Sequence, residues 1–153
     1  MKQFILIIAS AVSLLIFSFS AHALKVGALY LDTAGFFGEI KYGIEKAGEE
    51  EGIELTGANS QSDVAREAEF IDTLLATGVD VVIMSPVSTD SSVAAVERLA
   101  EAGVPVVCYN TCLNDEDAKR LAYALVTTSQ RELGYPVGVI AGNWAIKAGS
   151  DLK

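Results

Sequence analysis

Apolar residues in this chain form two kinds of pattern: short unbroken runs and longer segments with a helical repeat. The runs Val79–Met84 and Val104–Cys108 are rich in valine and do not alternate with polar residues, which is typical of strands buried on both faces of a parallel sheet. The segment between them, Ser91–Glu101, carries an apolar stripe with helical spacing, formed by Val93, Val96, Leu99 and Ala100. This central stretch predicts a strand, a helix and a second, parallel strand.

The same alternation extends along the chain on both sides. Further strands are expected at Leu24–Leu31, Ile53–Ala58 and Leu121–Val126. Further helices are expected at Glu39–Glu51, at Val64–Thr77 and from about Ser129 to Lys147, where Pro136 should fray or kink the early part. Leu113–Arg120 is expected to be an acidic connection before the fifth strand. We therefore predict an α/β fold with a doubly wound parallel sheet.

The first residues have the pattern of an export signal. Lys2 gives a positive start, Phe4–Phe19 is an almost unbroken apolar run, and Ala21-His22-Ala23 has small residues at the spacing of a cleavage site. The alternative, a membrane anchor, needs roughly 20 apolar residues, and the run is shorter. We predict a signal peptide over residues 1–23, cleaved after Ala23, with no lipid anchor, and one mature domain over residues 24–153.

Composition excludes several classes of function. The formal net charge of the 153-residue chain is −9 and no basic cluster occurs, which argues against binding to nucleic acid or an anionic membrane surface. The turn after the first strand has Gly35 and Gly38 but no G-x-G-x-x-G motif, so no nucleotide cofactor is expected. The single histidine, His22, lies in the predicted signal, and no G-x-S-x-G motif occurs. We expect no enzyme activity and no cofactor.

Cys108 and Cys112 flank three residues at the end of a predicted strand. An oxidising compartment permits a disulfide between them, but the two residues lie too far apart unless the loop turns back sharply. A metal site is the weaker alternative, because zinc would need further Cys or His ligands. The sequence leaves the disulfide open and predicts no metal.

Polar and aromatic residues gather in the loops expected at the carboxyl edge of the sheet, where open α/β sheets bind ligands. The candidates are Phe36, Phe37, Ser62, Asp63, Asp90, Asn110, Thr111, Ser129 and Gln130. Aromatic faces can cover the C–H side of a sugar ring, while amides, hydroxyls and carboxylates bind its hydroxyl groups. Two alternatives stay open: the phenylalanines can be core residues under the first helix, and Asp90 can be a helix N-cap.

Four motifs carry a resemblance that covers essentially all of the predicted mature chain. They are D-T-A-G-F-F-G over 32–38, G-V-D-V-V-I-M-S-P-V-S-T-D over Gly78–Asp90, A-G-V-P-V-V over Ala102–Val107, and T-T-S-Q-R-E-L-G at the start of the last helix. With them the chain resembles the type I periplasmic binding proteins, in particular the ribose/galactose-like sugar-binding group of ABC importers. The resemblance implies two similar α/β lobes that close around a sugar, and a location in the periplasm.

The resemblance also assigns roles to particular positions. An aromatic pair from the first loop matches Phe36 and Phe37, and polar residues of the second loop match Ser62 and Asp63. An Asp-Arg pair after the fourth strand is replaced here by Asn110-Thr111, and an Asp-Asn pair at the next helix is replaced by Ser129-Gln130. Because both pairs lose their charge, the resemblance does not carry over a ribose-like or galactose-like specificity.

Members of this family are about twice as long, so the chain resembles the amino-terminal lobe only, either as a truncated gene or as a fragment. We expect the isolated lobe to bind sugar weakly or not at all, because the cleft is not enclosed. It is also expected to form a homodimer through the surface that the second lobe would cover.

The predicted function is that of a periplasmic solute-binding component that delivers a sugar or sugar-like solute to an inner-membrane ABC permease. Alternatives are a receptor for a sugar-like signal, such as an autoinducer or chemoreceptor ligand, and a non-functional truncated fragment. A transcriptional regulator of the same fold would carry an amino-terminal helix-turn-helix where this chain has an export signal. A flavodoxin-like or Rossmann enzyme would need the phosphate loop and histidine that are missing.

Overall fold

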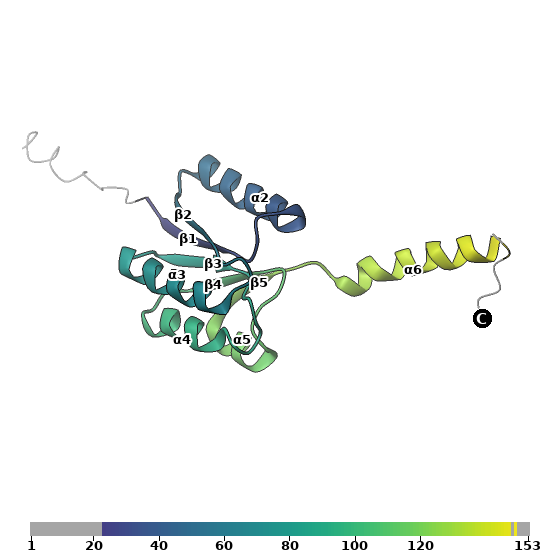
Figure 1. The fold of residues 1–153 in the computed structure, drawn as a ribbon. Coiled ribbons are helices and arrows are strands. Elements are labelled where there is room, and N and C mark those ends of the chain that lie inside the picture. The colour runs from purple at the N-terminus through teal and green to yellow at the C-terminus, as the bar shows by residue number, and fades with distance from the viewer. Residues whose placement is uncertain (1–22, 148, 150–153) are drawn as a thin grey trace, which may run out of the picture.

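The computed structural model describes residues 23–147 and residue 149, so the predicted signal peptide lies outside the described residues except for Ala23. Strands and helices alternate along the chain (Figure 1). The strands are β1 (Lys25–Tyr30), β2 (Glu54–Asn59), β3 (Val81–Met84), β4 (Val106–Tyr109) and β5 (Ala122–Val126). The helices are α2 (Gly35–Glu51), α3 (Val64–Thr77), α4 (Val93–Glu101), α5 (Asp115–Leu121) and α6 (Gln130–Lys147).

The five strands form one sheet in the order β2-β1-β3-β4-β5, and every neighbouring pair is parallel. The sheet register runs without interruption from β2 to β4 and shifts between Val106 and Val107, where β4 meets β5. The predicted α/β fold with a parallel sheet is confirmed. Parallel strands end at a common edge, so the loops after all five strands lie together.

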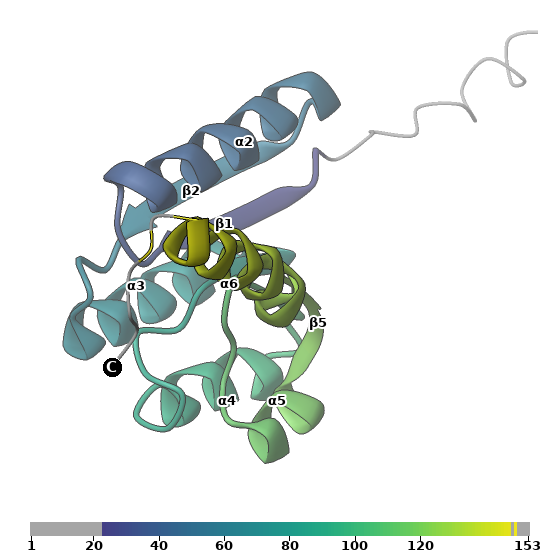
Figure 2. The ribbon, with the colours of Figure 1, turned by 90° about the vertical axis from the view of Figure 1, so that its right-hand side faces the viewer.

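Helices α3, α4 and α5 cover one face of the sheet, and α2 lies on the other (Figures 1 and 2). The main hydrophobic core fills the space under the three helices. Its fully buried members are Leu29, Ile71, Leu74, Val82, Met84, Val96, Leu99, Val106 and Cys108.

The expectation that β3 and β4 are buried on both faces is correct for one face only. Val82 and Val106 face the three helices and are fully buried, whereas Ile83 and Val107 on the α2 side are half-buried. A single helix is too narrow to cover five strands, and an apolar cleft of about 350 Å³ remains between α2 and the sheet near Ile83. The valine-rich runs therefore predict the strands but not how evenly the sheet is covered.

Local predictions also need correction. The segment expected to be an acidic connection is largely the helix α5. Its first turn carries three acidic residues and its C-terminal turn carries Lys119 and Arg120, an arrangement that the helix dipole favours. Leu121, expected in the fifth strand, is the last residue of that helix. Helix α2 begins at Gly35 instead of Glu39. The apolar stripe expected in α4 contained Ala100, but Ala100 is exposed and Ala95 is buried in its place.

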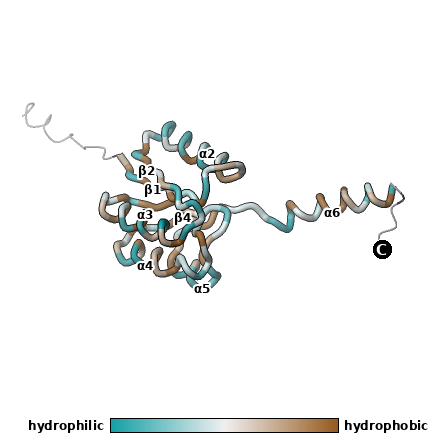
Figure 3. The backbone as a smooth tube through the Cα atoms, in the orientation of Figure 1, coloured by the Kyte–Doolittle hydropathy of each residue, from teal (hydrophilic) through white to brown (hydrophobic). Residues whose placement is uncertain are grey.

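Helix α6 leaves the body of the domain at the carboxyl edge of the sheet, and none of its described residues is buried (Figures 1 and 2). Many of its apolar side chains are exposed, and apolar and polar residues alternate along its length, as the colours of Figure 3 show. Pro136 lies inside the helix as expected. Among the described residues, no helix has the length and apolar character that a membrane span needs.

A fully buried carboxyl group connects α3 to the loop after β3. The Glu67 side chain is 0% exposed, and its Oε2 accepts a hydrogen bond from the Val87 amide at 2.8 Å. Its other oxygen, Oε1, has no partner among the described residues. Burial raises the pKa of Glu67 above the usual glutamate value, although the Ser92 hydroxyl and the Val87 amide oppose the shift.

This burial predicts a pH-dependent effect of Glu67→Gln. A raised pKa means that the folded state binds the proton more tightly, so the contribution of Glu67 to the free energy of unfolding is full below the usual glutamate pKa and declines as pH rises through the raised value. Glu67→Gln removes the buried charge and keeps an acceptor for Val87. We expect it to raise the free energy of unfolding at pH 7 by about 1 kcal/mol and to change it little at pH 4.

The measurement is urea denaturation at both pH values, with Glu69→Gln as the matched control. Glu69 is exposed on the same helix, so the control removes the same formal charge without a buried site. Equal effects of the two substitutions at pH 7 would contradict the interpretation.

Candidate ligand site at the carboxyl edge

A cavity of about 290 Å³ opens at the carboxyl edge of the sheet, between the start of α2 and the ends of β4 and β5. Its lining side chains carry no formal charge: Phe36, Ile40, Tyr109, Asn110, Val126, Thr127 and Thr128. Two aromatic rings, one side-chain amide and three hydroxyl groups, one of them on the second ring, thus surround a partly apolar space. Such a surface can bind a small neutral molecule that has both C–H and hydroxyl faces.

The two phenylalanines differ in their exposure. Both stand in the first turn of α2 instead of in a preceding loop, and their rings meet edge to face at 5.3 Å between centroids. Phe36 is 63% exposed and lines the cavity, whereas Phe37 is half-buried and lies outside the lining. Phe36 is therefore the aromatic residue available to a ligand.

Tyr109 joins the ends of two strands at the cavity. Its hydroxyl oxygen accepts a hydrogen bond from the Leu31 amide at 3.3 Å, which connects the end of β4 to the residue after β1. The side chain is 7% exposed, and this burial raises the pKa of Tyr109 above the usual tyrosine value. The phenol is therefore uncharged at neutral pH.

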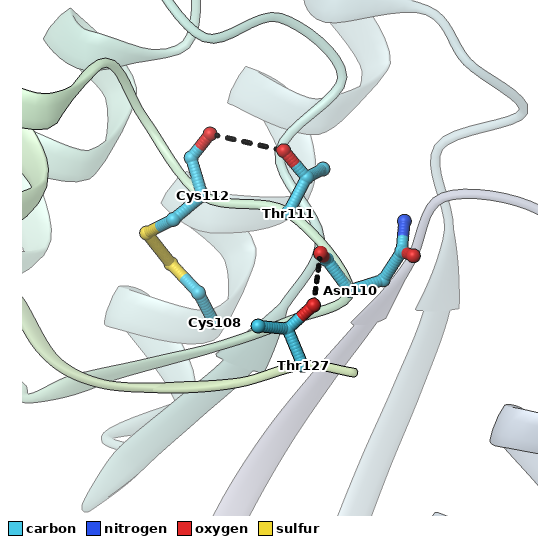
Figure 4. The surroundings of a disulfide bond; sticks show 5 residues. All are labelled: Cys108, Asn110, Thr111, Cys112 and Thr127. Carbon is cyan, nitrogen blue, oxygen red and sulfur yellow. Dashed lines mark hydrogen bonds between the residues drawn. A yellow bond between two sulfur atoms is a disulfide. The ribbon is translucent and has the colours of Figure 1, made fainter. Parts of the chain in front are cut away.

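Asn110 occupies the turn after β4 with a φ of 61°, in the left-handed region that asparagine tolerates better than most residues. Its backbone amide donates to the Val126 carbonyl at 2.9 Å, and its backbone carbonyl accepts from the Thr127 hydroxyl at 2.9 Å. The structure joins Cys108 and Cys112 by a disulfide around this turn (Figure 4). Thr111 lies inside the same turn, where its hydroxyl donates to the Cys112 carbonyl at 3.4 Å.

Asp63 and Ser62 lie outside the cavity lining. The Asp63 carboxylate accepts from the backbone amides of Ala65 and Arg66 at 2.8 and 3.0 Å, so it is the N-cap of α3. Ser62 is exposed in the preceding turn with a φ of 58°.

Asp90 also lies outside the lining and is not the N-cap that the sequence leaves open. Its Oδ1 accepts from the Asn114 side-chain amide at 3.0 Å, which ties the start of α4 to the start of α5. The Ser88 hydroxyl oxygen accepts the Ser91 amide at 3.0 Å in that turn instead.

Ser129 and Gln130 stand where the chain passes from β5 to α6. The Ser129 hydroxyl oxygen accepts the Glu132 amide at 3.3 Å, and the Gln130 side chain donates to the Thr128 hydroxyl at 3.3 Å. Both are exposed and beyond the lining. Of the predicted set, the structure therefore brings Phe36 and Asn110 together at the cavity. It also places Tyr109, Val126 and Thr127 there. Their position at strand ends is the sequence signal that could have indicated them.

Groups of three or more His, Cys, Asp or Glu side chains able to hold a metal ion do not occur within residues 23–147 and 149.

The comparisons with known proteins agree with this architecture. A family model described as periplasmic binding protein domain matches residues 28–150. The chain belongs to the periplasmic binding protein family. The family and fold predictions are thereby confirmed.

Three curated proteins are similar to this chain in sequence. The ABC transporter periplasmic-binding protein YphF of Escherichia coli is 36% identical over 125 residues, which cover 80% of this chain and 38% of that protein. A putative rhizopine-binding protein of Rhizobium meliloti is 35% identical over 112 residues, covering 72% and 35%. A xylitol-binding protein of Mycolicibacterium smegmatis is 30% identical over 93 residues, covering 61% and 27%. The chain spans less than two fifths of each of these relatives.

Solved structures of binding proteins share the fold. A Mycobacterium smegmatis protein in complex with β-D-fucofuranose superposes with a TM-score of 0.74 at 23% identity, over 82% of this chain and 41% of the other. An ABC transporter solute-binding protein of Bacillus halodurans with bound myo-inositol gives a TM-score of 0.64 at 20% identity, over 73% and 38%. At these identities the similarity establishes the fold alone.

The hydrogen bond from Leu31 to Tyr109 predicts an effect of Tyr109→Phe on stability. The substitution leaves the half-buried Leu31 amide without its acceptor, and an unsatisfied amide costs about 1–3 kcal/mol. We expect the free energy of unfolding, measured by urea denaturation, to fall by about 1 kcal/mol or more.

Tyr123→Phe is the matched control, because Tyr123 is 80% exposed on the neighbouring strand β5. It should change stability by less than about 0.5 kcal/mol. A Tyr109→Phe variant as stable as this control would show that the hydrogen bond does not hold the edge together.

Proposed function

We propose that the carboxyl edge of this sheet is one wall of the solute-binding cleft of an ABC importer's periplasmic binding protein, and that its ligand is a neutral sugar or polyol. The observation that carries the proposal is the uncharged lining of the cavity, with an exposed aromatic face beside an amide and hydroxyl groups. Phe36 would cover the C–H face of the ligand, and Asn110 and Thr127 would bind its hydroxyl groups.

The relatives support this class of ligand. Xylitol, β-D-fucofuranose and myo-inositol appear in the names of similar proteins and structures, and all three are uncharged polyhydroxylated molecules. A carboxylated or phosphorylated sugar would need a cationic partner, and the cavity lining has none.

The same family membership supports the remaining parts of the proposal. Residues 1–23 would direct export and be removed after Ala23, and the mature chain would deliver solute to an inner-membrane permease without performing chemistry. In the family's two-lobed members the opposite wall of a cleft comes from a second lobe. Because this chain presents one wall, its own affinity should be in the millimolar range, since a half-open site buries less of the ligand.

A thermal-shift series tests the proposal directly. Ligand that binds only the folded state raises the melting midpoint, and about 50 mM of a ligand with a dissociation constant of about 5 mM adds roughly 1.4 kcal/mol of stability. We expect a rise with at least one of xylitol, myo-inositol and D-ribose, and no rise with D-glucuronate. Phe36→Ala should abolish the rise.

Tyr42→Ala is the control for this variant. Tyr42 is 66% exposed on the same helix and lies outside the cavity lining, so its removal should leave the rise unchanged. A flat response to all the neutral polyols, or an unchanged rise in Phe36→Ala, would contradict the proposed site. Micromolar affinity of the monomer would contradict the single-wall account.

We also propose that the isolated chain forms a homodimer through α6. Leu133, Val137, Ile140 and Trp144 recur at helical spacing on one side of this helix, and all are exposed. Light scattering between about 10 and 500 µM should show a concentration-dependent dimer, and Ile140→Asp should keep the chain monomeric. A monomer across this range would refute the dimer.

A further inference from the structure

The disulfide closes a sharp turn that contains one of the residues lining the cavity. Cys108 and Cys112 are 1% and 6% exposed, and their Cα atoms lie 5.4 Å apart. Four residues of extended chain would span about 13 Å. The crosslink therefore prevents the end of β4 from continuing outward in an extended conformation.

The residue enclosed by this turn belongs to the cavity. Asn110 lines it, and its side chain points away from the disulfide (Figure 4). The backbone of Asn110 is in the left-handed region, which is unfavourable for a residue with a Cβ. Two hydrogen bonds hold it to the end of β5: its backbone amide donates to Val126, the last residue of that strand, and its backbone carbonyl accepts from the hydroxyl of the next residue, Thr127.

We propose that the Cys108–Cys112 disulfide is a positioning element of the ligand site. The crosslink excludes extended conformations of the turn. The side-chain amide of Asn110 is therefore already placed at the cavity before a ligand binds. Fixing a binding group in its bound geometry lowers the entropy lost on binding and so raises affinity. The effect on affinity rests on the proposed function, whereas the effect on the conformation of Asn110 does not.

The test compares two variants by amide hydrogen exchange. The reference is the backbone amide of Val82, which donates to the Pro105 carbonyl in the middle of the sheet. In the double variant Cys108→Ala/Cys112→Ala, the exchange rate of the Asn110 backbone amide, divided by that of Val82, should rise at least tenfold. Leu74→Ala is the control, because it weakens the buried core under α3 and keeps the disulfide. In the control, the ratio of the two exchange rates should stay as in the wild type.

Binding supplies the second readout. With xylitol, myo-inositol and D-ribose as probes in a titration followed by NMR, the double variant should lose at least fivefold in affinity, and Leu74→Ala should retain it while folded. An unchanged exchange ratio in the double variant would overturn the proposal. A raised ratio with unchanged affinity would overturn the link to the ligand.

Failure of the proposed function can be distinguished from failure of the disulfide proposal. If the wild-type chain binds none of the probes, the proposed function fails, and the exchange ratio alone decides whether the disulfide positions Asn110. If the double variant does not fold, the same ratio is measured in wild-type chain reduced by dithiothreitol. This dithiol transfers two electrons and two protons to the two sulfur atoms and leaves as a cyclic disulfide. An unchanged ratio after reduction would also overturn the proposal.

Discussion

Parallel pairing of all five strands is the constraint on which the rest of this domain depends. It places every strand end at one edge, and hydrogen bonds between the loops then fix that edge. The Leu31 amide donates to the Tyr109 hydroxyl oxygen, and Asn110 is held to the last residue of β5 and to the residue after it. The cavity is thus framed by residues that are far apart in the sequence and close together only because the strands run in the same direction.

The sheet is covered unevenly, and this has consequences for binding. Three helices bury one face, whereas the other face has only α2 and retains an apolar cleft. Helix α6 departs from the edge of the sheet and covers neither face. The candidate site lies at the edge of this sheet, with Phe36 open to solvent. Such a surface is suited to contribute selectivity for neutral ligands, while strong affinity needs further enclosure.

Much of the fold could be predicted from sequence because its signals are local. Valine-rich runs mark the strands, and the glycines Gly52 and Gly78, which adopt left-handed conformations at helix ends, mark where α2 and α3 stop. Helix α5 escaped prediction because seven residues are too few for a clear apolar repeat, and its charges resemble those of a polar connection. The uneven cover of the sheet depends on tertiary packing and has no local signal.

The site was predictable only in part, for a related reason. The rule that ligands bind at strand ends predicted Phe36 and Asn110, which the structure places in the cavity lining. Tyr109 was missed because a tyrosine that ends an apolar strand resembles a core residue until its contact with Leu31 is seen. Asp63 and Asp90 lie outside the cavity lining, and their carboxylates accept hydrogen bonds from a backbone amide and from a side-chain amide, respectively. The sequence does not rank such contacts against a ligand contact.

The most direct test of the central claim is a titration of isotope-labelled chain with myo-inositol and xylitol, followed by backbone amide shifts. If the carboxyl edge is a polyol site, the amides of Phe36, Asn110 and Thr127 should shift together along one saturable curve in the millimolar range. Shifts confined to the apolar cleft beneath α2, for example at Gly43 and Ile53, would contradict the account, as would the absence of any saturable shift.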